Sequence, residues 1–443
     1  MSGAELAQTL TGSGENAGGQ AIVNVPGDVV VTLISVIESI PVPPPGTAPR
    51  HGLGADHNAR CDRGRAAAAG DWLRTTQDGY TMPPMSNPPS ERDTAFQDRI
   101  LQGVSRTFAL TIPTLPAALY HAVANAYLLC RIADTIEDDA GLPFDDKLRY
   151  SQAFIDIVRG DGDAAAFAAE LAPRLASHTL AAERELVAET PAVIRITHSL
   201  NANQRAAMEA CVRTMADGMV YYQGQETLDG LADQAAMDRY CYYVAGVVGE
   251  MLTALFCDHC PELQPRRAEM MRLAVSFGQG LQMTNILKDI WDDRARGACW
   301  LPADVFAARG VRLSDIAPGR GGPGFEDALG ELISVAHGHL RNALRYTCML
   351  PREQPGMRKF CLWALGMAVL TLRKLNRHRD YADGSEVKIS RRSVKATVIS
   401  TNALVRSNAG LWALFALASS GLPQREITAS APTVIDEAES RVV

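Results

Sequence analysis

Apolar side chains recur every three to four residues along most of the chain after Ser90. This spacing predicts amphipathic α-helices, whereas the strict alternation typical of strands is scarce. Ser90-Glu-Arg-Asp93 has the pattern of a helix N-cap, and prolines punctuate the apolar stretches that follow. The expected fold is therefore all-α. The helices that we predict cover residues 92–110, 114–138, 145–160, 164–176, 180–187, 201–224, 236–257, 264–294, 325–349, 353–378 and 391–420.

The periodic pattern is missing from the two ends of the chain. Residues 1–88 are rich in Gly, Pro, Ala and Ser and include the run Pro41-Val-Pro-Pro-Pro45. Such a composition cannot bury enough apolar surface to order the chain, so we expect a disordered N-terminal extension. We predict one large helical domain over 89–425 and a flexible tail over 426–443.

Composition and charge narrow the function classes. The chain has 443 residues, of which 47% are hydrophobic and 21% charged, with a net charge of -7. An acidic chain of this kind has no basic field for nucleic acid. The nine cysteines lie scattered in apolar stretches, which indicates reduced thiols and a cytoplasmic protein.

No stretch of the sequence shows the ~20 consecutive apolar residues that are needed to span a bilayer. The apolar segment Ala409–Ala418 is too short for that. It predicts either a core helix or a peripheral membrane contact, the second of which would suit a protein with a very hydrophobic product.

Two acidic segments carry the strongest chemical signal. Asp134, Glu137 and Asp138 end the helix predicted over 114–138, and Asp289 and Asp293 end the helix predicted over 264–294. Carboxylates four residues apart share one helix face and repel each other unless a cation lies between them. Carboxylates near an apolar stretch suit Mg²⁺, which binds through one or two carboxylates and substrate phosphates. The alternative is a pair of solvated acidic helix ends, but aspartates at a helix C-terminus oppose the helix dipole.

Basic residues lie beside these acidic segments in the sequence. They are Arg106, Arg131, Lys288, Arg294 and Arg296. Positive groups interleaved with metal-binding acids are what a diphosphate leaving group needs. Taken singly, each arginine is as well explained by an ordinary ion pair.

The segment from Tyr240 to Gly249 combines aromatic rings with glycines. Gly246 and Gly249 each cost a helix about 1 kcal/mol relative to alanine. The missing side chains would make room for a ligand or for a closely packed helix, and the residues alone leave both open. The face of an aromatic ring can stabilise a carbocation beside it.

Four ordered motifs in this chain resemble the squalene and phytoene synthases, which join two allylic diphosphates head to head. The resemblance covers residues 100–400. The motifs are Val104-Ser-Arg-Thr-Phe108, Tyr127-Leu-Leu-Cys-Arg131-Ile-Ala-Asp134-Thr-Ile-Glu-Asp138-Asp139, Tyr240-Cys-Tyr-Tyr-Val-Ala-Gly-Val-Val-Gly249 and Leu281-Gln-Met-Thr-Asn285-Ile-Leu-Lys288-Asp289-Ile-Trp-Asp-Asp293.

The resemblance implies a single helical domain of the isoprenoid-synthase type with a central hydrophobic cavity. It implies that Tyr240, Asp134, Asp138, Asp289 and Asp293 are catalytic. The implied Mg²⁺ ligands are Asp134, Glu137, Asp138, Asn285, Asp289 and Asp293. The residues implied to bind the diphosphate or line the hydrocarbon channel are Arg106, Tyr127, Arg131, Gln282, Asn285, Lys288, Arg296, Phe108, Val244 and Val248.

Within the family the chain is most similar to the squalene synthases. Its Val387-Lys388-Ile389 turn resembles the segment that contacts NADPH in those enzymes. The resemblance therefore implies that two farnesyl diphosphates condense through presqualene diphosphate and are reduced with NADPH. The implied NADPH contacts are Arg106, Arg131, Lys288, Lys388 and Arg391.

Two departures from the squalene-synthase pattern keep a second activity open. Ser390 stands where the pattern usually has arginine, and Lys288 stands where arginine is usual. Lysine keeps the charge but lacks the bidentate fork of arginine. The alternative is a phytoene, dehydrosqualene or presqualene-diphosphate synthase, which omits the reduction.

Overall fold

The computed structural model describes residues 89–105, 108–223 and 226–430. The predicted N-terminal extension, residues 1–88, and most of the predicted tail lie outside the described residues, as does Arg106. Throughout the described ranges the secondary structure is helical, apart from one isolated bridge between Leu231 and Pro302. The expectation of an all-α fold is confirmed.

The first helix begins where the sequence predicted. Ser90 caps α1 (Glu91–Val104) through a capping box, in which its hydroxyl accepts from the Asp93 amide at 3.2 Å. The prediction of one helix over 92–110 was wrong, because Ser105 is extended and its hydroxyl accepts from the Phe108 amide at 2.9 Å. A short second helix, α2 (Phe108–Thr111), starts from that bond.

Helices from the first half of the chain form one end of the molecule, around α3 (Ala117–Asp138). The sequence missed α7, because Pro191 was taken as a break between elements, whereas proline is well suited to the first turn of a helix. The other helices of this end are α4 (Phe144–Arg159), α5 (Ala164–Leu171), α6 (Ala181–Ala188), α7 (Thr190–Ser199) and α8 (Ala202–Gln223).

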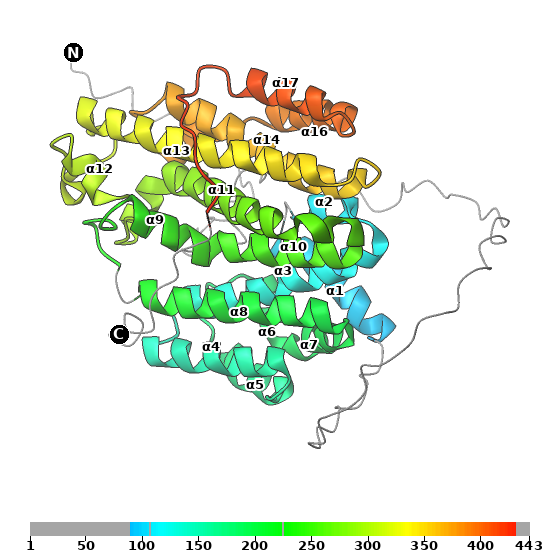
Figure 1. Ribbon diagram of the computed structural model, residues 1–443. Coiled ribbons are helices and arrows are strands. Elements are labelled where there is room, and N and C mark those ends of the chain that lie inside the picture. The colour runs from blue at the N-terminus through cyan, green and yellow to red at the C-terminus, as the bar shows by residue number, and fades with distance from the viewer. Residues whose placement is uncertain (1–88, 106–107, 224–225, 431–443) are drawn as a thin grey trace, which may run out of the picture.

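Long helices from the second half stack beside α8 and α3, in the order seen from the middle to the top of Figure 1. A π-helical turn, Tyr242–Gly246, joins α9 (Gln234–Cys241) to α10 (Val247–His259). The next layers are α11 (Arg267–Ala295), α13 (Gly322–Met349) and α14 (Pro355–Arg377). The sequence did not predict the short helices α12 (Ala303–Ala307) and α15 (Gly384–Val387).

Glycines allow α10 and α11 to cross closely. A Cβ atom added to Gly249 would lie 2.5 Å from the carbonyl oxygen of Ala274, and one added to Gly278 would overlap the carbonyl of Ala245. Backbone atoms cannot move aside as a flexible side chain can. Of the two explanations for Gly249, close helix packing is therefore the one that the structure supports.

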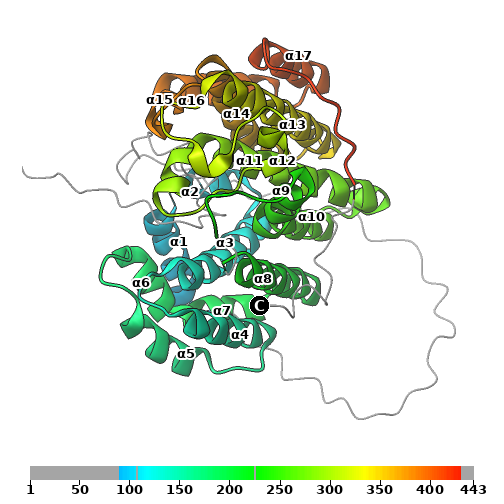
Figure 2. The same cartoon turned by 90° about the vertical axis from the view of Figure 1, so that its left-hand side faces the viewer.

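The last two helices form an outer layer on α14. The prediction of one helix over 391–420 was wrong, because the chain forms α16 (Arg391–Leu404) and α17 (Asn408–Ala418). Ser407 separates them, since its hydroxyl caps α17 by accepting from the Gly410 amide at 3.1 Å. Both views place this pair at the same end of the molecule (Figures 1 and 2).

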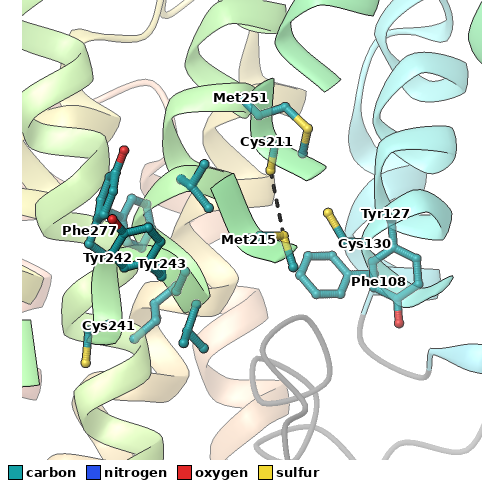
Figure 3. Packing of buried hydrophobic residues seen from close by; sticks show 14 of the residues in the cluster. Phe108, Tyr127, Cys130, Cys211, Met215, Cys241, Tyr242, Tyr243, Met251 and Phe277 are labelled. Carbon is teal, nitrogen blue, oxygen red and sulfur yellow. Dashed lines mark hydrogen bonds between the residues drawn. The ribbon is translucent and has the colours of Figure 1, made fainter. Parts of the chain in front are cut away.

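One continuous apolar core runs through these layers. In Figure 3, Phe108 and Tyr127 lie on one side of Met215, and Tyr242, Tyr243 and Phe277 lie on the other. By length and composition, the helix Gln234–His259 could cross a membrane, although 72% of its most apolar window is buried in the protein. The sequence predicted one helix over 236–257 but no stretch apolar enough to span a bilayer. The second expectation was wrong by length and composition, because the π-turn keeps α9 and α10 in one continuous helical segment.

Candidate active site

The first acidic motif lies at the C-terminal end of α3. The side chain of Asp134 is buried, and Glu137 and Asp138 are half-buried on the last turn. Two side chains from neighbouring helices hold this turn in place: Gln223 Nε2 donates to the Glu137 carbonyl at 2.7 Å, and Lys147 Nζ donates to the same oxygen. The motif is therefore anchored through its backbone.

Asp139, the next residue, has a structural role. Its carboxylate accepts hydrogen bonds from Thr179 Oγ1 at 2.5 Å, from the Ala176 amide at 3.0 Å and from the Gly141 amide at 2.8 Å. These bonds satisfy a buried charge and fix the loop that leaves α3. Asp139 consequently differs from Asp138, although the two are adjacent in the sequence.

The second acidic motif lies near the C-terminal end of α11, where the helix bends. Asp289 has non-helical backbone angles, with φ -105° and ψ 16°. Lys288 is only 1% exposed and its ammonium lies 3.0 Å from the Asp289 carboxylate. A buried lysine requires such a partner, because an uncompensated charge in the interior is costly.

Asp293 is one turn further along α11. Burial raises the pKa of Asp293 to about 7, against the opposing effect of the Arg296 guanidinium, which lies 2.5 Å from it. The negative charges of Asp289 and Asp292 add to the increase in pKa. This region of α11 therefore concentrates negative charge in a poorly solvated position, which favours binding of a cation.

Aromatic side chains brace the bend in α11. The Tyr381 hydroxyl donates to the Leu287 carbonyl at 2.5 Å, and Trp291 Nε1 donates to the Tyr381 carbonyl at 2.7 Å. These two bonds attach the loop before α15 to the back of the acidic motif. A Cβ atom on Gly384, the first residue of α15, would lie 3.1 Å from the Lys288 carbonyl. The tight fit brings Lys388, the residue after α15, near Asp292. Burial raises the pKa of Asp292, and the positive charge of Lys388 opposes that increase.

Tyr240 connects the two acidic motifs. Burial raises the pKa of Tyr240 well above its usual range, and the negative charges of Glu137, Asp293 and Asp138 raise it further. Since electrostatic effects of this kind require proximity, the tyrosine lies within reach of both helix ends. Its ring stacks on Trp300, with centroids 4.2 Å apart, and meets the edge of Tyr222 at 5.1 Å.

The residues expected along the hydrocarbon channel lie in the apolar core. Phe108 and Tyr127 have ring centroids 4.9 Å apart, and the Tyr127 hydroxyl donates to the Val104 carbonyl at 2.9 Å. Val244 is buried within the π-turn and Val248 is half-buried on α10. The helices thus bring these side chains into one apolar region, and the cavity itself stays a prediction.

The predicted basic residues fall into different environments. Arg131 is buried and forms an ion pair with Glu183 of α6. Arg294 donates to the carbonyls of Leu313 at 2.8 Å and Ile316 at 3.0 Å, which gives it a structural role in the loop after α11. Lys388 and Arg391 are exposed near the start of α16. Arg106 lies outside the described residues.

The residues on α11 fit a divalent cation. Gln282 and Asn285 are buried on α11, and Asn285 Oδ1 accepts no hydrogen bond from any described residue. An amide oxygen one turn before Asp289 is a ligand that Mg²⁺ accepts. Across the described ranges, no three His, Cys, Asp or Glu side chains group closely enough to hold a metal by themselves. An ion at either motif would therefore complete its coordination with oxygens of water or of a bound diphosphate.

Several residues at this site had no signal in the sequence. Trp300, Tyr222, Lys147, Gln223 and Tyr381 are brought in from four different segments. None belongs to a repeated spacing or to a motif. The one usable signal in the sequence is position. Some of these residues follow an acidic motif closely, as Trp300 follows Asp293.

Comparison with known proteins supports the resemblance seen in the motifs. Residues 101–393 match the squalene/phytoene synthase family. A squalene synthase of Schizosaccharomyces pombe is 29% identical over 64% of this chain, and squalene synthase 1 of Arabidopsis thaliana is 29% identical over the same share. The chain spans 59% of the length of the yeast relative and 65% of the plant relative.

Solved structures share the fold. A ligand complex of TcSQS superposes with a TM-score of 0.61 at 24% identity, covering 74% of this chain and 92% of that one. A dehydrosqualene synthase superposes with a TM-score of 0.51 at 18% identity, covering 72% of this chain and 98% of that one. With the four motifs on neighbouring helices and the family match across most of the described residues, the chain belongs to the squalene/phytoene synthase family.

Proposed function

We propose that this chain is a Mg²⁺-dependent squalene synthase, which condenses two farnesyl diphosphates through presqualene diphosphate and reduces the product with NADPH. The observation that best supports this proposal is the position of Tyr240, buried within electrostatic reach of Glu137, Asp138 and Asp293. One general acid or base between two diphosphate-binding motifs suits a reaction with two ionisations. The similarity to squalene synthases of yeast and plant points to the same activity.

The two acidic motifs are assigned to diphosphate binding through metal. Asp134, Glu137 and Asp138 form the first ligand group, and Asn285, Asp289 and Asp293 form the second. Bound Mg²⁺ would neutralise the charge that develops on a departing diphosphate. Arg106, Arg131, Gln282, Lys288 and Arg296 are assigned to the diphosphate oxygens. In the present structure Lys288 and Arg296 balance Asp289 and Asp293.

The chain's own residues are assigned to two further tasks, the exclusion of water from the reactive cation and the transfer of a proton. Phe108, Tyr127, Val244 and Val248 are assigned to the hydrocarbon, where apolar walls keep water away from a reactive cation. The raised pKa of Tyr240 keeps its hydroxyl protonated, so that it can relay a proton to a more basic acceptor. Its packing on Trp300 fixes the direction of the ring.

The reductive step is assigned to the region around α15. NADPH would supply hydride, and Lys388, Arg391, Lys288, Arg106 and Arg131 are the residues proposed to bind it. Lys388 is exposed and lies close enough to Asp292 to affect its pKa, which places a positive charge beside the second acidic motif.

A specific observation favours the non-reducing alternative. The Ser390 hydroxyl caps α16 by accepting from the Ser393 amide at 3.1 Å. At the position where squalene synthases usually have arginine, this chain therefore has an uncharged cap. A phytoene, dehydrosqualene or presqualene-diphosphate synthase would not need that charge.

The remaining parts of the proposal concern the domain, the partners and the location. Residues 89–425 are proposed to form the catalytic domain, with farnesyl diphosphate as substrate and no nucleic-acid partner. The protein is proposed to be cytoplasmic, with a peripheral membrane contact through which the hydrophobic product leaves. The eight described cysteines are free thiols, as suits a reducing compartment.

Product analysis tests the proposal. The purified full chain is incubated with farnesyl diphosphate and Mg²⁺, with and without NADPH, and the products are identified by mass spectrometry. Squalene is expected only with NADPH, and presqualene diphosphate or dehydrosqualene without it. The same non-reduced hydrocarbon in both reactions would favour the alternative, and no consumption of substrate would contradict both.

A further inference from the structure

The outer layer formed by α16 and α17 differs in charge from the rest of the protein. Residues 387–425 contain six basic residues and no aspartate or glutamate, whereas the whole chain has a net charge of -7. The basic residues are Lys388, Arg391, Arg392, Lys395, Arg406 and Arg425. A positive surface on an acidic protein attracts anionic partners.

The same layer carries the most exposed large hydrophobic side chains of the described residues. Ile399 on α16 is 70% exposed and Leu417 on α17 is 71% exposed. The two helices pack against each other and lie together at one end of the molecule in both views (Figures 1 and 2). Inward-facing residues such as Val394 and Leu411 are buried, so each helix has one face in the protein and one that faces outward.

A basic hollow borders this layer. Its volume is about 810 Å³, and Trp412 of α17 forms part of its wall. Four arginines line it, namely Arg272, Arg341, Arg345 and Arg425. Glu269 and Glu426 lie 3.7 and 3.9 Å from Arg345 and Arg341, and Glu331 lies 3.2 Å from Arg425, so one positive charge is in excess among these residues. Arginine binds phosphate oxygens well, because its planar group donates two parallel hydrogen bonds.

We propose that the outer face of α16 and α17 docks on an anionic phospholipid bilayer, with Ile399 and Leu417 entering the interface. The exposed basic residues that are not assigned to NADPH then face lipid phosphates, namely Arg392, Lys395 and Arg406. Apolar side chains flanked by lysine and arginine are typical of helices that lie in the plane of a membrane. A nucleic acid would match the charge but would leave Ile399 and Leu417 in contact with a polar backbone. This surface would make the membrane contact that the proposed function includes. Only the biological purpose of the contact rests on the proposed function.

Vesicle binding tests the inference without reference to catalysis. The full chain is sedimented with vesicles of phosphatidylcholine alone and with vesicles of an equal mixture of phosphatidylcholine and phosphatidylglycerol. Binding is expected to the mixed vesicles and to fall steeply at about 0.5 M salt, where surface charges are screened. Equal binding to both kinds of vesicle, or to neither, would overturn the inference.

Substitutions separate the two contributions. Lys395→Gln with Arg406→Gln should weaken binding to mixed vesicles about 25-fold, at about fivefold for each charge near an anionic surface. Ile399→Ser with Leu417→Ser should weaken it about tenfold or more, because the inserted apolar area is lost. Leu180→Ser is the matched control, since Leu180 is 53% exposed but lies before α6, at the other end of the molecule.

The controls also separate this inference from the proposed function. All five substituted side chains are outside the proposed catalytic site, so each variant should turn over a soluble substrate at the wild-type rate, and circular dichroism should show an unchanged fold. A loss of vesicle binding in Leu180→Ser equal to that in the α16 and α17 variants would contradict the proposed surface. Binding to a single-stranded oligonucleotide that is as tight as vesicle binding, and unaffected by Ile399→Ser with Leu417→Ser, would assign the surface to nucleic acid instead.

Discussion

The rings of Tyr240 and Trp300 lie face to face, with centroids 4.2 Å apart and planes 6° from parallel. The tyrosine comes from α9, whereas the tryptophan follows the end of α11. The stack therefore joins the segment that carries the proposed proton relay to the segment that carries the second acidic motif. Contacts of this kind contribute about 1 kcal/mol beyond the area that they bury.

The first prediction concerns this stack. Trp300→Leu should lower kcat on the order of tenfold, because the tyrosine ring would lose its fixed direction. Trp300→Phe should retain most of the activity, since it preserves an aromatic face, whereas Tyr240→Phe should be as slow as Trp300→Leu or slower. Steady-state rates of farnesyl diphosphate consumption give the comparison. A normal kcat in Trp300→Leu would show that Tyr240 does not depend on its neighbour.

The second prediction concerns the acidic motifs. Asp134→Ala and Asp289→Ala should each lower turnover by on the order of a thousandfold, because each removes a ligand for charge neutralisation at a diphosphate. The folded structure should survive, as judged by circular dichroism. Asp145→Ala is the control, because Asp145 is an exposed acid on α4. A rate near that of the wild type in either variant would contradict the proposal of two metal-binding motifs.

The third prediction concerns the reductive step. Lys388→Gln should raise the KM for NADPH about tenfold, the effect of losing one charge-assisted contact to a phosphate. Formation of presqualene diphosphate without NADPH should be unchanged. Lys395→Gln, two turns further along on α16, should leave both steps as they are. If Lys388→Gln alters neither step, the cofactor is not bound where the Val-Lys-Ile turn suggests.

How far the sequence reached can be seen at the ends of the helices. Apolar periodicity correctly predicted the all-α class, because the residues that bury against neighbouring helices must repeat with the helical turn. It failed at Ser105 and Ser407, where one hydroxyl hydrogen bond ends a helix or starts the next. Such a local bond leaves the apolar pattern almost unchanged, so two pairs of helices were predicted as single ones.

The site divides in a similar way. Asp134, Asp289 and Tyr240 stand in recognisable motifs, and the folded chain brings their segments together. Trp300 and Gln223 could not be predicted, because their importance comes from distant segments that meet only in the folded protein. The interaction between Arg131 and Glu183 is of this kind too, since no local spacing connects α3 with α6.

The fourth prediction concerns the crossing of α10 and α11. Gly249→Ala should destabilise the protein by about 1–3 kcal/mol, because its new Cβ would meet the carbonyl of Ala274. Helix propensity alone would make Gly249→Ala stabilising by about 1 kcal/mol, so a destabilised variant would show that the close contact outweighs propensity. Ala254→Gly on the same helix provides the comparison with propensity alone. Urea unfolding gives the free energies, and a stabilised Gly249→Ala would show that the helices can separate.

The fifth prediction concerns a buried histidine. Burial lowers the pKa of His339 to about 4 from its usual value near 6.5, and its ring nitrogen lies 2.8 Å from the Ser276 hydroxyl. Between these two values the unfolded chain binds more protons than the folded one, so stability should rise with pH across this interval and stay level above it. The contribution of His339 to the slope of the unfolding free energy against pH approaches about 1.4 kcal/mol per pH unit. His339→Gln should remove that slope in urea titrations, and an unchanged slope would assign the effect to other groups.

The π-turn from Tyr242 to Gly246 sets the rotational phase of the helix that it interrupts. Upstream of it Tyr240 is buried within electrostatic reach of Glu137, Asp138 and Asp293, and downstream of it Gly249 packs against α11. One residue corresponds to about 100° of rotation in an α-helix. A single-residue deletion or insertion here would turn the tyrosine away from the site or the glycine away from its neighbour, so the number of residues in this stretch matters to the site as much as their identity.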